Sequence, residues 1–482
     1  MNRSIRAVTI FSFVLILALI ANLTFIQSFQ TDSLAHNPKN SRQFLEAQMR
    51  QRGQISAGGQ VLAQSVADEN GVYHRKYVTS PETFAPVEGY LSPRFGAAGI
   101  ESSQNSILTG EDDALFTQRT WDKLTGKEAR GANVELTLDP DVQQVAHDQL
   151  SANGYSGSVV ALRPSTGEVL AMASTPSFNP SSLVEVPGDQ QETNFNQLSQ
   201  DPDAPLLNRA TQQTQPPGST FKVITTAAAL MDGDSKDTPV SAAQNTTLPG
   251  TETTLENYNG STCGGGSETT LFEAFRRSCN VPFVETGIKH GTDKFKKVAE
   301  DFGIGGREDK MGLPVQPSTI GDIPDAAALG QSAIGQRDVA LTPLQNAEIA
   351  ATIANGGVRM SPYLVSKVTG ADLKPLITGK PHKAGEAIPK DVSDQITELM
   401  KASESWGNGQ SDIASKTGTA EHGEDSRNSN PHAWYIAFST TGDVAVAVLV
   451  ENGGNRGQEA TGGSVAAPIG RAVINQAVNK AK

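Results

Sequence analysis

Cysteine and histidine are scarce in this chain. Its 482 residues include two cysteines and seven histidines. The two cysteines, Cys263 and Cys279, cannot build a disulfide scaffold or a four-cysteine zinc site. The histidines show no His-Glu-x-x-His or other paired-ligand spacing, so the sequence gives no support to a zinc peptidase.

Basic charge is also in short supply. Lys and Arg number 39 against 52 Asp and Glu, which gives a formal net charge of −13, and no basic block occurs. Since phosphate contacts need clustered Lys and Arg, the sequence predicts no nucleic-acid partner. With 37% hydrophobic and 19% charged residues, 46 Gly and 26 Pro, collagen, a coiled coil and full disorder are excluded. The length allows two or three domains.

A long run that is both uncharged and almost wholly apolar stands at the N-terminus. Residues 7–26 carry no charge and follow Arg3 and Arg6. About 20 such residues, at a rise of about 1.5 Å each, cross a bilayer core. The arginines predict a cytoplasmic tail at 1–6, a membrane anchor at 7–26 and an extracytoplasmic remainder. A cleaved signal peptide with Ser33-Leu34-Ala35 as its cleavage site is the competing interpretation, but the apolar stretch is long for one.

Strands and helices alternate in the middle of the chain. Alternating hydrophobic residues predict a strand at 131–138, and Asp139-Pro140 is a typical cap and first turn of a helix. Residues 158–162 and 168–173 form a predicted hairpin. Helical periodicity then dominates from 175 to about 410.

Strands return near the C-terminus, before a final helix. The three strands are predicted at 413–420, 433–438 and 444–450, and the helix at about 466–478. Trp434, in the second strand, is expected in the sheet core. The architecture is therefore α/β: a five-stranded, mainly antiparallel sheet with a large helical insertion, behind an N-terminal stalk. We expect the stalk at 27–150 and the sheet domain at 151–482.

A Ser-x-x-Lys motif supplies a candidate nucleophile and base. Ser219 and Lys222 lie three residues apart at the predicted start of a buried helix, so both side chains share one helix face. A serine with an adjacent amine is the minimum for covalent acyl transfer, and the helix N-terminus favours developing negative charge. Such tetrads also arise by chance at ordinary helix starts.

Two further motifs follow in a set order. Lys416-Thr417-Gly418 is the only Lys-Thr-Gly and lies on a predicted strand, where glycine permits close approach of a ligand. Ser-x-Asn occurs five times, and Ser278-Cys279-Asn280 is singled out because it lies between the other two motifs, within the helical insertion. In this order the three motifs are far more specific than any one alone.

The three motifs resemble those of penicillin-binding proteins and related β-lactamases. The similarity covers about residues 52–475 and includes a stalk motif at 52–55. It implies that family's transpeptidase domain, with helices on both sheet faces and a large helical subdomain, behind an α+β stalk domain with a dimerisation or pedestal role. The stalk is too short for a glycosyltransferase, so the chain is most similar to the monofunctional class B enzymes with a short stalk. One departure is Ser56-Ala57-Gly58-Gly59, where the family's stalk motif continues with an acidic-Arg-Asn-Gly turn.

The resemblance implies roles for the first motif. Ser219 attacks a carbonyl and Lys222 accepts its proton, which requires the amine's pKa to fall well below its ordinary value of about 10.4. Burial and the second cation, Lys416, would lower it. The backbone N–H groups of Ser219 and Thr419 would form the oxyanion hole.

The resemblance also implies the substrate, a peptidoglycan stem peptide ending in D-Ala-D-Ala. Ser278 would relay a proton to the leaving amine, and Asn280 would hold the substrate amide. The terminal carboxylate of the substrate would be bound by Lys416, Thr417, Gly418 and Thr419. β-Lactams would acylate the same serine, and no metal or cofactor is required. Implied partners are a glycan polymerase and the machinery of division or elongation.

The two cysteines lie 16 residues apart, one of them inside the second motif. In an oxidising compartment a pair this close often forms a disulfide, and we expect a bridge between Cys263 and Cys279. Two free thiols are the alternative, because spacing alone does not fix the Cα geometry.

Other functions of the same residues remain open at this point. A β-lactam sensor would need a cytoplasmic signalling segment, but about six residues precede the predicted span. A D,D-carboxypeptidase or β-lactamase would use water as the acceptor. A non-catalytic scaffold would have no need of the complete motif set. The class B resemblance favours transpeptidation.

Overall fold

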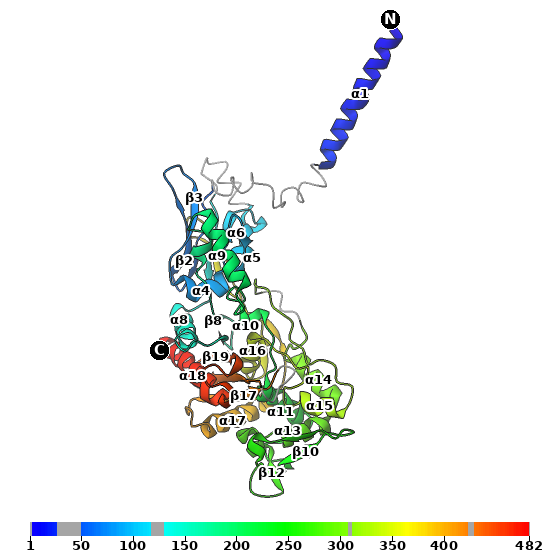
Figure 1. Cartoon of the computed structure of the whole chain (residues 1–482), viewed down its shortest axis with the longest axis vertical. Coiled ribbons are helices and arrows are strands. Elements are labelled where there is room, and N and C mark those ends of the chain that lie inside the picture. The colour runs from blue at the N-terminus through cyan, green and yellow to red at the C-terminus, as the bar shows by residue number, and fades with distance from the viewer. Residues whose placement is uncertain (1, 27–49, 117–129, 307–310, 423–428, 482) are drawn as a thin grey trace.

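The computed structural model describes the chain in five stretches, residues 2–26, 50–116, 130–306, 311–422 and 429–481 (Figure 1). Helix α1, Asn2–Phe25, begins it. Among the described residues, its part Ile5–Phe25 is the one helix long and apolar enough to cross a membrane, and none of that part is buried (Figure 1). The helix therefore fits the expected single span. Ser33-Leu34-Ala35, the alternative cleavage site, lies outside the described residues.

The predicted five-stranded sheet is confirmed. Every neighbouring pair in it is antiparallel, and the strand ends agree with the sequence prediction to within two residues. The order across the sheet is β17 (Ile413–Ala420), β18 (His432–Ser439), β19 (Ala445–Val450), β7 (Gly157–Leu162) and β8 (Val169–Thr175).

Helices cover both faces of this sheet. Along β18, Tyr435 packs in the core beneath α8 (Pro140–Ser151) and α18 (Ala467–Ala481). The next residue, Ile436, points to the opposite core, which is formed with α11 (Lys222–Met231) and α16 (Pro343–Ala354). This alternation follows from the strand's period of two, and burial on both faces explains why the strands are almost wholly apolar.

The helical insertion contains more strands than its periodicity predicts. Its helices and 3₁₀ turns begin after β8 with η3 (Pro180–Leu183), α9 (Gly188–Gln200), α10 (Arg209–Gln212) and η4 (Gly218–Phe221). Five more helices precede and follow α16, namely α12 (Leu271–Arg277), α13 (Val281–His290), α14 (Thr292–Asp301), α15 (Ala326–Ser332) and α17 (Lys390–Trp406). Short two-stranded sheets pair β9 (Pro239–Ser241) with β12 (Glu268–Thr270), β10 (Asn245–Thr247) with β11 (Thr254–Glu256), and β13 (Val358–Met360) with β16 (Lys383–Glu386). Strands of three or four residues are too short to produce a detectable alternation.

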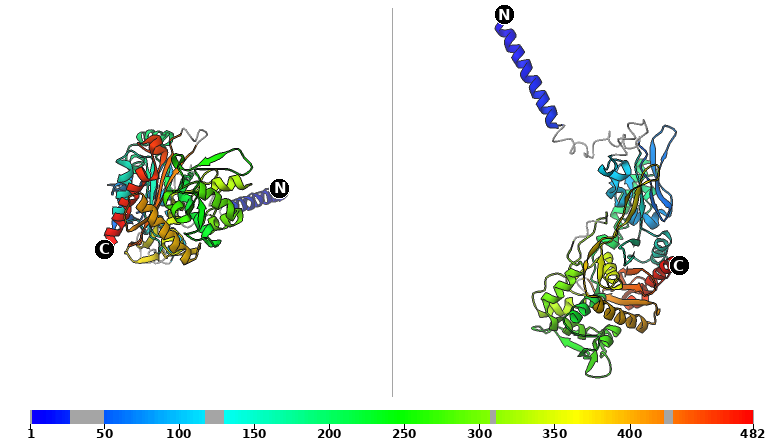
Figure 2. Two further views of the ribbon diagram at one scale, coloured as in Figure 1. Left: turned by 90° about the horizontal axis from the view of Figure 1, so that it is seen from below. Right: turned by 180° about the vertical axis from the view of Figure 1, so that it is seen from behind.

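The stalk is built on a six-stranded sheet. Its order is β15 (Pro375–Thr378), β14 (Val365–Thr369), β6 (Asn133–Leu136), β1 (Ile55–Ala57), β2 (Gln60–Ala67) and β3 (Tyr73–Tyr77). Shorter elements of the stalk are α4 (Pro81–Glu88), β4 (Leu91–Ser92), β5 (Gly96–Ala97), α5 (Gly99–Ser103), α6 (Asn105–Thr109) and η2 (Asp113–Leu115). In Figures 1 and 2 the stalk elements lie between α1 and the larger sheet domain.

The boundary between the two parts is not a single point in the sequence. Strands β14 and β15 come from residues 365–378, yet they extend the stalk sheet by pairing with β6. Helix α8, expected in the stalk at 27–150, packs instead on the larger sheet through Val142, Ala146 and Leu150. The sequence pattern reveals a strand or an amphipathic helix but not the partner it pairs with, which is why the linear division at 150 differs from the fold.

The stalk buries a cluster of charged side chains. Arg52 and Arg75 both donate to the carboxylate of Glu101, with Arg52 Nε at 2.8 Å, and all three are nine-tenths buried or more. Burial alone would raise the pKa of Glu101, but the two guanidinium groups hold it below its ordinary value. Glu88, fully buried nearby, has no hydrogen-bond partner among the described residues, and desolvation together with the charge of Glu101 raises its pKa well above the usual range.

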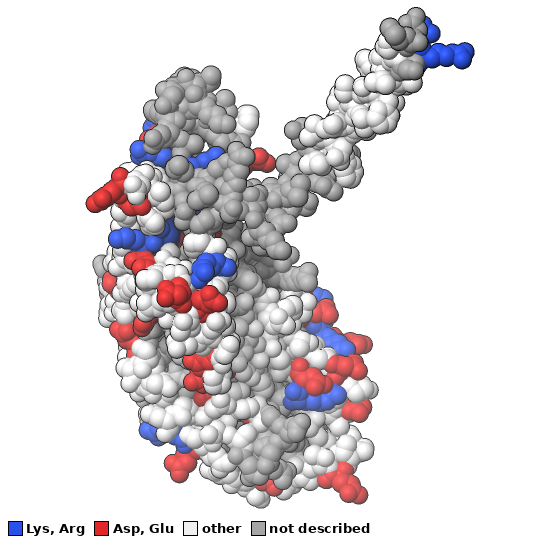
Figure 3. All heavy atoms as spheres, turned by 45° about the horizontal axis from the view of Figure 1, so that its top comes forward, with Lys and Arg blue, Asp and Glu red and all other residues white. Residues whose placement is uncertain are grey.

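The surface carries both signs of charge. On the face shown in Figure 3, acidic and basic side chains are interspersed, and no broad basic patch stands out.

Candidate active site

Ser219 lies on a 3₁₀ turn, η4, immediately before α11. Gly218 opens the turn with a φ of +53°, a conformation that favours glycine. Its N–H donates to the carbonyl of Gly335 at 3.0 Å, and the indole N–H of Trp434 donates to the carbonyl of Pro216 at 2.8 Å. Trp434 is fully buried, as predicted, but it also anchors the segment that leads to Ser219.

The second motif links two helices. Ser278 ends α12 with a φ of +60°, and Asn280 begins α13. Cys279, between them, forms a disulfide with Cys263, and the two Cα atoms are 5.9 Å apart. The left-handed backbone at Ser278 and the disulfide together define a sharp, tethered turn.

Lys222 reaches this turn from α11. Its side chain is fully buried, and its Nζ donates to the carbonyl of Ser278 and to Oδ1 of Asn280, each at 2.8 Å. Ser278 Oγ lies 3.5 Å from the same nitrogen. The spacing of the first motif predicted a contact of this amine with Ser219, yet among the described residues no hydrogen bond joins them. Such contacts are often loose in ligand-free enzymes.

Lys416 approaches Ser278 from the opposite side. This lysine lies on β17, is fully buried, and donates from Nζ to Ser278 Oγ at 2.7 Å and to the carbonyl of Thr417 at 2.9 Å. Ser278 thus lies between the two lysines. Phenyl rings flank both amines, with Phe283 5.5 Å from Lys222 Nζ and Phe275 5.8 Å from Lys416 Nζ.

Burial sets the electrostatics of the two amines. Among the described residues neither lysine forms an ion pair. Desolvation, followed by the charge of Lys416, lowers the pKa of Lys222 well below its usual value. Desolvation lowers the pKa of Lys416 to about 7. Burial therefore disfavours the charged form of both amines, and the nearby charge of Lys416 adds to this effect at Lys222.

The third motif packs closely against the nucleophile turn. A Cβ on Gly418 would lie 2.7 Å from the carbonyl oxygen of Pro217, and one on Gly218 would lie 2.8 Å from that of Thr419. The backbones of η4 and β17 can approach this closely because glycine stands at both places. Thr417 and Thr419 alternate with buried residues on β17 and remain partly exposed, as do Ser219, Ser278 and Asn280.

One residue at the site carries no sequence signal. Asn257, 23 positions before Asn280, is buried and accepts the backbone N–H of Asn280 at 2.8 Å. It belongs to none of the three motifs, and asparagines are frequent in the polar stretch around it. Only the folded structure brings it to the second motif.

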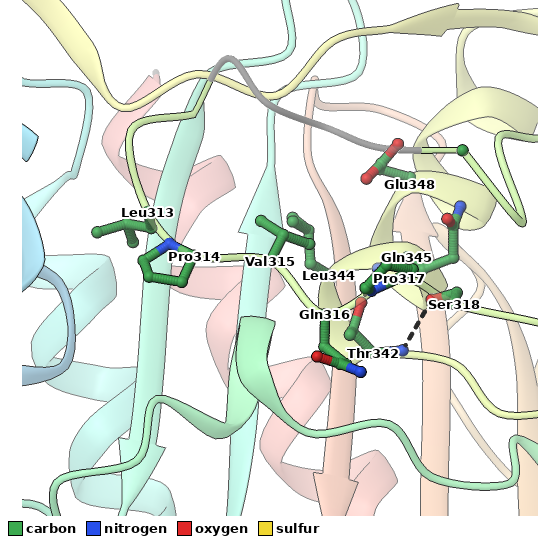
Figure 4. A pocket seen from close by; sticks show the side chains of 11 residues that line it. Leu313, Pro314, Val315, Gln316, Pro317, Ser318, Thr342, Leu344, Gln345 and Glu348 are labelled. Carbon is green, nitrogen blue, oxygen red and sulfur yellow. Dashed lines mark hydrogen bonds between the residues drawn. The ribbon is translucent and has the colours of Figure 1, made fainter.

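A separate cavity of about 390 Å³ lies in the helical insertion of the larger sheet domain (Figure 4). Residues 313–318 and the start of α16 line it, and Figure 4 shows Glu348 at one side, with the N–H of Thr342 donating to Ser318 Oγ at 3.1 Å. None of the motif residues lines this cavity. The candidate active site is therefore the convergence of the three motifs.

Two known domain families match the chain. Residues 157–475 match the penicillin binding protein transpeptidase domain, and residues 52–134 match the penicillin binding protein A dimerisation domain. The two stretches account for the sheet domain with its helical insertion and for the stalk up to β6.

Relatives match over the whole length. The chain is 49% identical to the peptidoglycan D,D-transpeptidase PbpA of Mycolicibacterium smegmatis, covering 100% of both chains. It is 46% identical to PbpA of Mycobacterium tuberculosis (strain CDC 1551 / Oshkosh), covering 99% of both. Penicillin-binding protein A from M. tuberculosis, solved as a penicillin G acyl-enzyme complex, superposes with a TM-score of 0.86 at 48% identity, over 89% of this chain and 99% of that one. The chain belongs to the class B penicillin-binding proteins, the peptidoglycan D,D-transpeptidases, and within them to the penicillin-binding protein A group.

Proposed function

We propose that Ser219 is the residue on which this D,D-transpeptidase forms its acyl-enzyme, with Lys222 as the general base. The observation that carries the proposal is the environment of Lys222, a buried amine with no carboxylate partner among the described residues and a lowered pKa. A neutral amine can accept the proton of a serine hydroxyl, whereas an ammonium ion cannot.

The reaction then has two balanced halves. Ser219 Oγ bonds to the carbonyl carbon of the penultimate D-Ala while Lys222 takes the hydroxyl proton. The peptide C–N bond breaks, and the leaving nitrogen of the terminal D-Ala receives a proton. In the second half, the amine nitrogen of a neighbouring stem peptide bonds to the acyl carbon and the ester C–O bond breaks. The proton that the amine gives up restores the Ser219 hydroxyl. The net result is a cross-link and free D-alanine.

The backbone N–H groups of Ser219 and Thr419 are proposed as the oxyanion hole. The close approach of η4 and β17 at Gly218 and Gly418 supports this, because it brings the two backbones together. Donors of this kind, fixed before the reaction, are typically worth about 3–4 kcal/mol each in transition-state stabilisation.

Ser278 is proposed to relay the proton to the leaving amine. Its hydroxyl lies 2.7 Å from Lys416 Nζ and 3.5 Å from Lys222 Nζ, so it touches both amines. Asn280 is proposed to hold the substrate amide while its Oδ1 accepts from Lys222.

Recognition of the terminal carboxylate is proposed for Lys416 and the residues that follow it on β17. Lys416 supplies the cation, and the partly exposed hydroxyls of Thr417 and Thr419 supply donors. Gly418 between them leaves room for the ligand to approach the strand. Binding of a carboxylate would raise the pKa of Lys416 and keep it charged.

The placement in the cell follows from α1. We propose that residues 1–6 are cytoplasmic, that residues 7–26 span the membrane through the apolar part of α1, and that everything after them lies outside, where stem peptides are found. The domains proposed are a stalk, built from residues up to β6 and from β14 and β15, and a transpeptidase domain that includes α8. A glycan polymerase and division or elongation proteins are the proposed partners, with the stalk as the contact or dimerisation surface.

The test is the mass of the full chain in detergent after incubation with penicillin G. We expect one long-lived adduct, mapped to Ser219, which S219A loses. The matched control is S151A, which removes the exposed serine of a Ser-x-Asn outside the three motifs. An adduct that persists on S219A would contradict the assignment, rapid turnover would indicate a β-lactamase, and no adduct on the wild-type chain would indicate a scaffold.

A further inference from the structure

The helix that begins at the second motif is capped in an unusual way. Asn280 is the N-cap residue of α13, and asparagine in that position ordinarily accepts a hydrogen bond from an N–H of its own first turn. Here its side chain makes no such bond. Its Oδ1 instead accepts from Lys222 Nζ, and its Nδ2 donates to the carbonyl of Glu256 at 2.9 Å.

Asn257 takes over part of the cap. Its Oδ1 accepts from the N–H of Asn280 at 2.8 Å and from the N–H of Val281 at 2.9 Å. Its Nδ2 donates to the carbonyls of Ala243 and Ser261, each at 2.9 Å. The side chain is nine-tenths buried or more, and these four bonds use its full hydrogen-bonding capacity.

We propose that Asn257 is a positioning residue for transpeptidation, which caps α13 in place of Asn280 and thereby leaves the Asn280 side chain free to bind Lys222. The proposal rests on the function proposed for Lys222. Without Asn257, the Asn280 side chain can turn to its own helix N-terminus, and Lys222 loses a carbonyl acceptor. Asn257 does not touch the reacting atoms and acts through Asn280 alone.

The nearby disulfide cannot perform the same task. The Cys263–Cys279 bridge ties the loop that contains Asn257 to the second motif, but it restrains the backbone at Cys279. The direction of the Asn280 side chain is decided by which acceptor serves the N–H groups of α13. Without the disulfide, Asn257 can still form its hydrogen bonds to Asn280 and Val281. Without Asn257, the Asn280 side chain is no longer held toward Lys222.

The experiment measures the acylation rate constant of the full chain in detergent with penicillin G, as a function of pH. We expect N257A to acylate about tenfold more slowly than the wild type, the effect of losing one buried hydrogen-bond network. The rising limb of the pH–rate profile of N257A should shift to lower pH, because loss of an acceptor lowers the pKa of Lys222 and favours its neutral amine. N257D keeps an acceptor toward Asn280 and Val281 but loses the two bonds donated to Ala243 and Ser261, so it should recover only part of the rate.

Three controls separate the possible failures. N245A removes an exposed asparagine of the same subdomain and should behave as the wild type. If N257A does not fold, N257Q takes its place, since its longer side chain displaces the acceptor oxygen. Wild-type rate and pH midpoint in a folded N257A or N257Q, or equal rates for N257A and N257D, would overturn the proposal. If S219A still acylates, the proposed function fails instead, whatever the Asn257 variants do.

Discussion

The stalk and the active site each bury a pair of basic side chains, but the groups that surround the two pairs differ. In the stalk, Arg52 and Arg75 share the carboxylate of Glu101. In the active site, Lys222 and Lys416 share the hydroxyl of Ser278, and no described carboxylate pairs with either. Both pairs are almost completely removed from solvent.

The two regions differ in how burial affects the protonation of their basic groups. A buried cation beside a carboxylate keeps its charge, because the ion pair offsets part of the desolvation cost. A buried amine beside neutral acceptors loses that compensation, and its pKa falls, as it does for Lys222 and Lys416. Glu88 shows the same rule with the opposite sign, since its unpartnered carboxyl has a raised pKa. The stalk arrangement suits stability, and the active-site arrangement suits proton transfer.

The largest effect is expected from K222M. Loss of the general base should slow acylation by penicillin G about 10³-fold, within the range typical of such bases. The unfolding temperature should change little, because methionine replaces a buried amine that has no opposite charge. Stopped-flow acylation and thermal unfolding measure the two effects, with the exposed K401M as the control. A wild-type rate in K222M would end the assignment of Lys222 as the base.

In the stalk, we expect a substitution to lower stability and leave the acylation rate unchanged. E101Q leaves two buried guanidinium groups without a carboxylate, which should cost about 3 kcal/mol in the free energy of unfolding. Folded E101Q should acylate at the wild-type rate. Urea unfolding gives the cost, and E111Q is the matched control, since its partner Arg50 is exposed and the pair should contribute less than about 1 kcal/mol. A large fall in the acylation rate would show that the two regions are not independent.

The smallest effect is a pH dependence that concerns Lys416. Its pKa of about 7 means that the ligand-free enzyme loses this charge as the pH rises through that value. Acylation by a β-lactam carboxylate should therefore decline above pH 7, with a limiting slope of about tenfold per pH unit. Penicillin G methyl ester, which has no carboxylate, should react more slowly and lack this decline. The same falling limb for acid and ester would assign it to another group.

Much of the site could be predicted because its residues lie in short motifs. Lys222 and Lys416 are recognisable in the sequence, and the structure places both at Ser278. The direct bond between Ser219 and Lys222 could not be judged from spacing, because it depends on where the amine finds its acceptors. Asn257 was missed for a different reason. Its contacts join segments 23 residues apart, and no local periodicity encodes them.

For the fold, too, features set by local sequence could be predicted, whereas pairings between distant segments could not. Five apolar strands and the cap at Asp139 are local patterns, and the structure confirms them. The membership of β14 in the stalk sheet depends on a pairing with β6 more than 200 positions earlier in the chain, with Val368 opposite Val134. Helix α8 likewise has an ordinary amphipathic pattern that does not say which sheet it covers.

The stalk sheet takes its strands from two distant segments of the chain. This arrangement limits which segments can be exchanged between related proteins to make a chimera. A chimera that exchanges residues 52–134 alone would end inside β6 and set Asn133 and Val134 of one parent against β14 of the other. To transplant a complete stalk, the graft must also carry residues 365–378, which the chain reaches only after the nucleophile and the second motif have been made. The stalk sheet is therefore complete only once the chain has been made as far as residue 378.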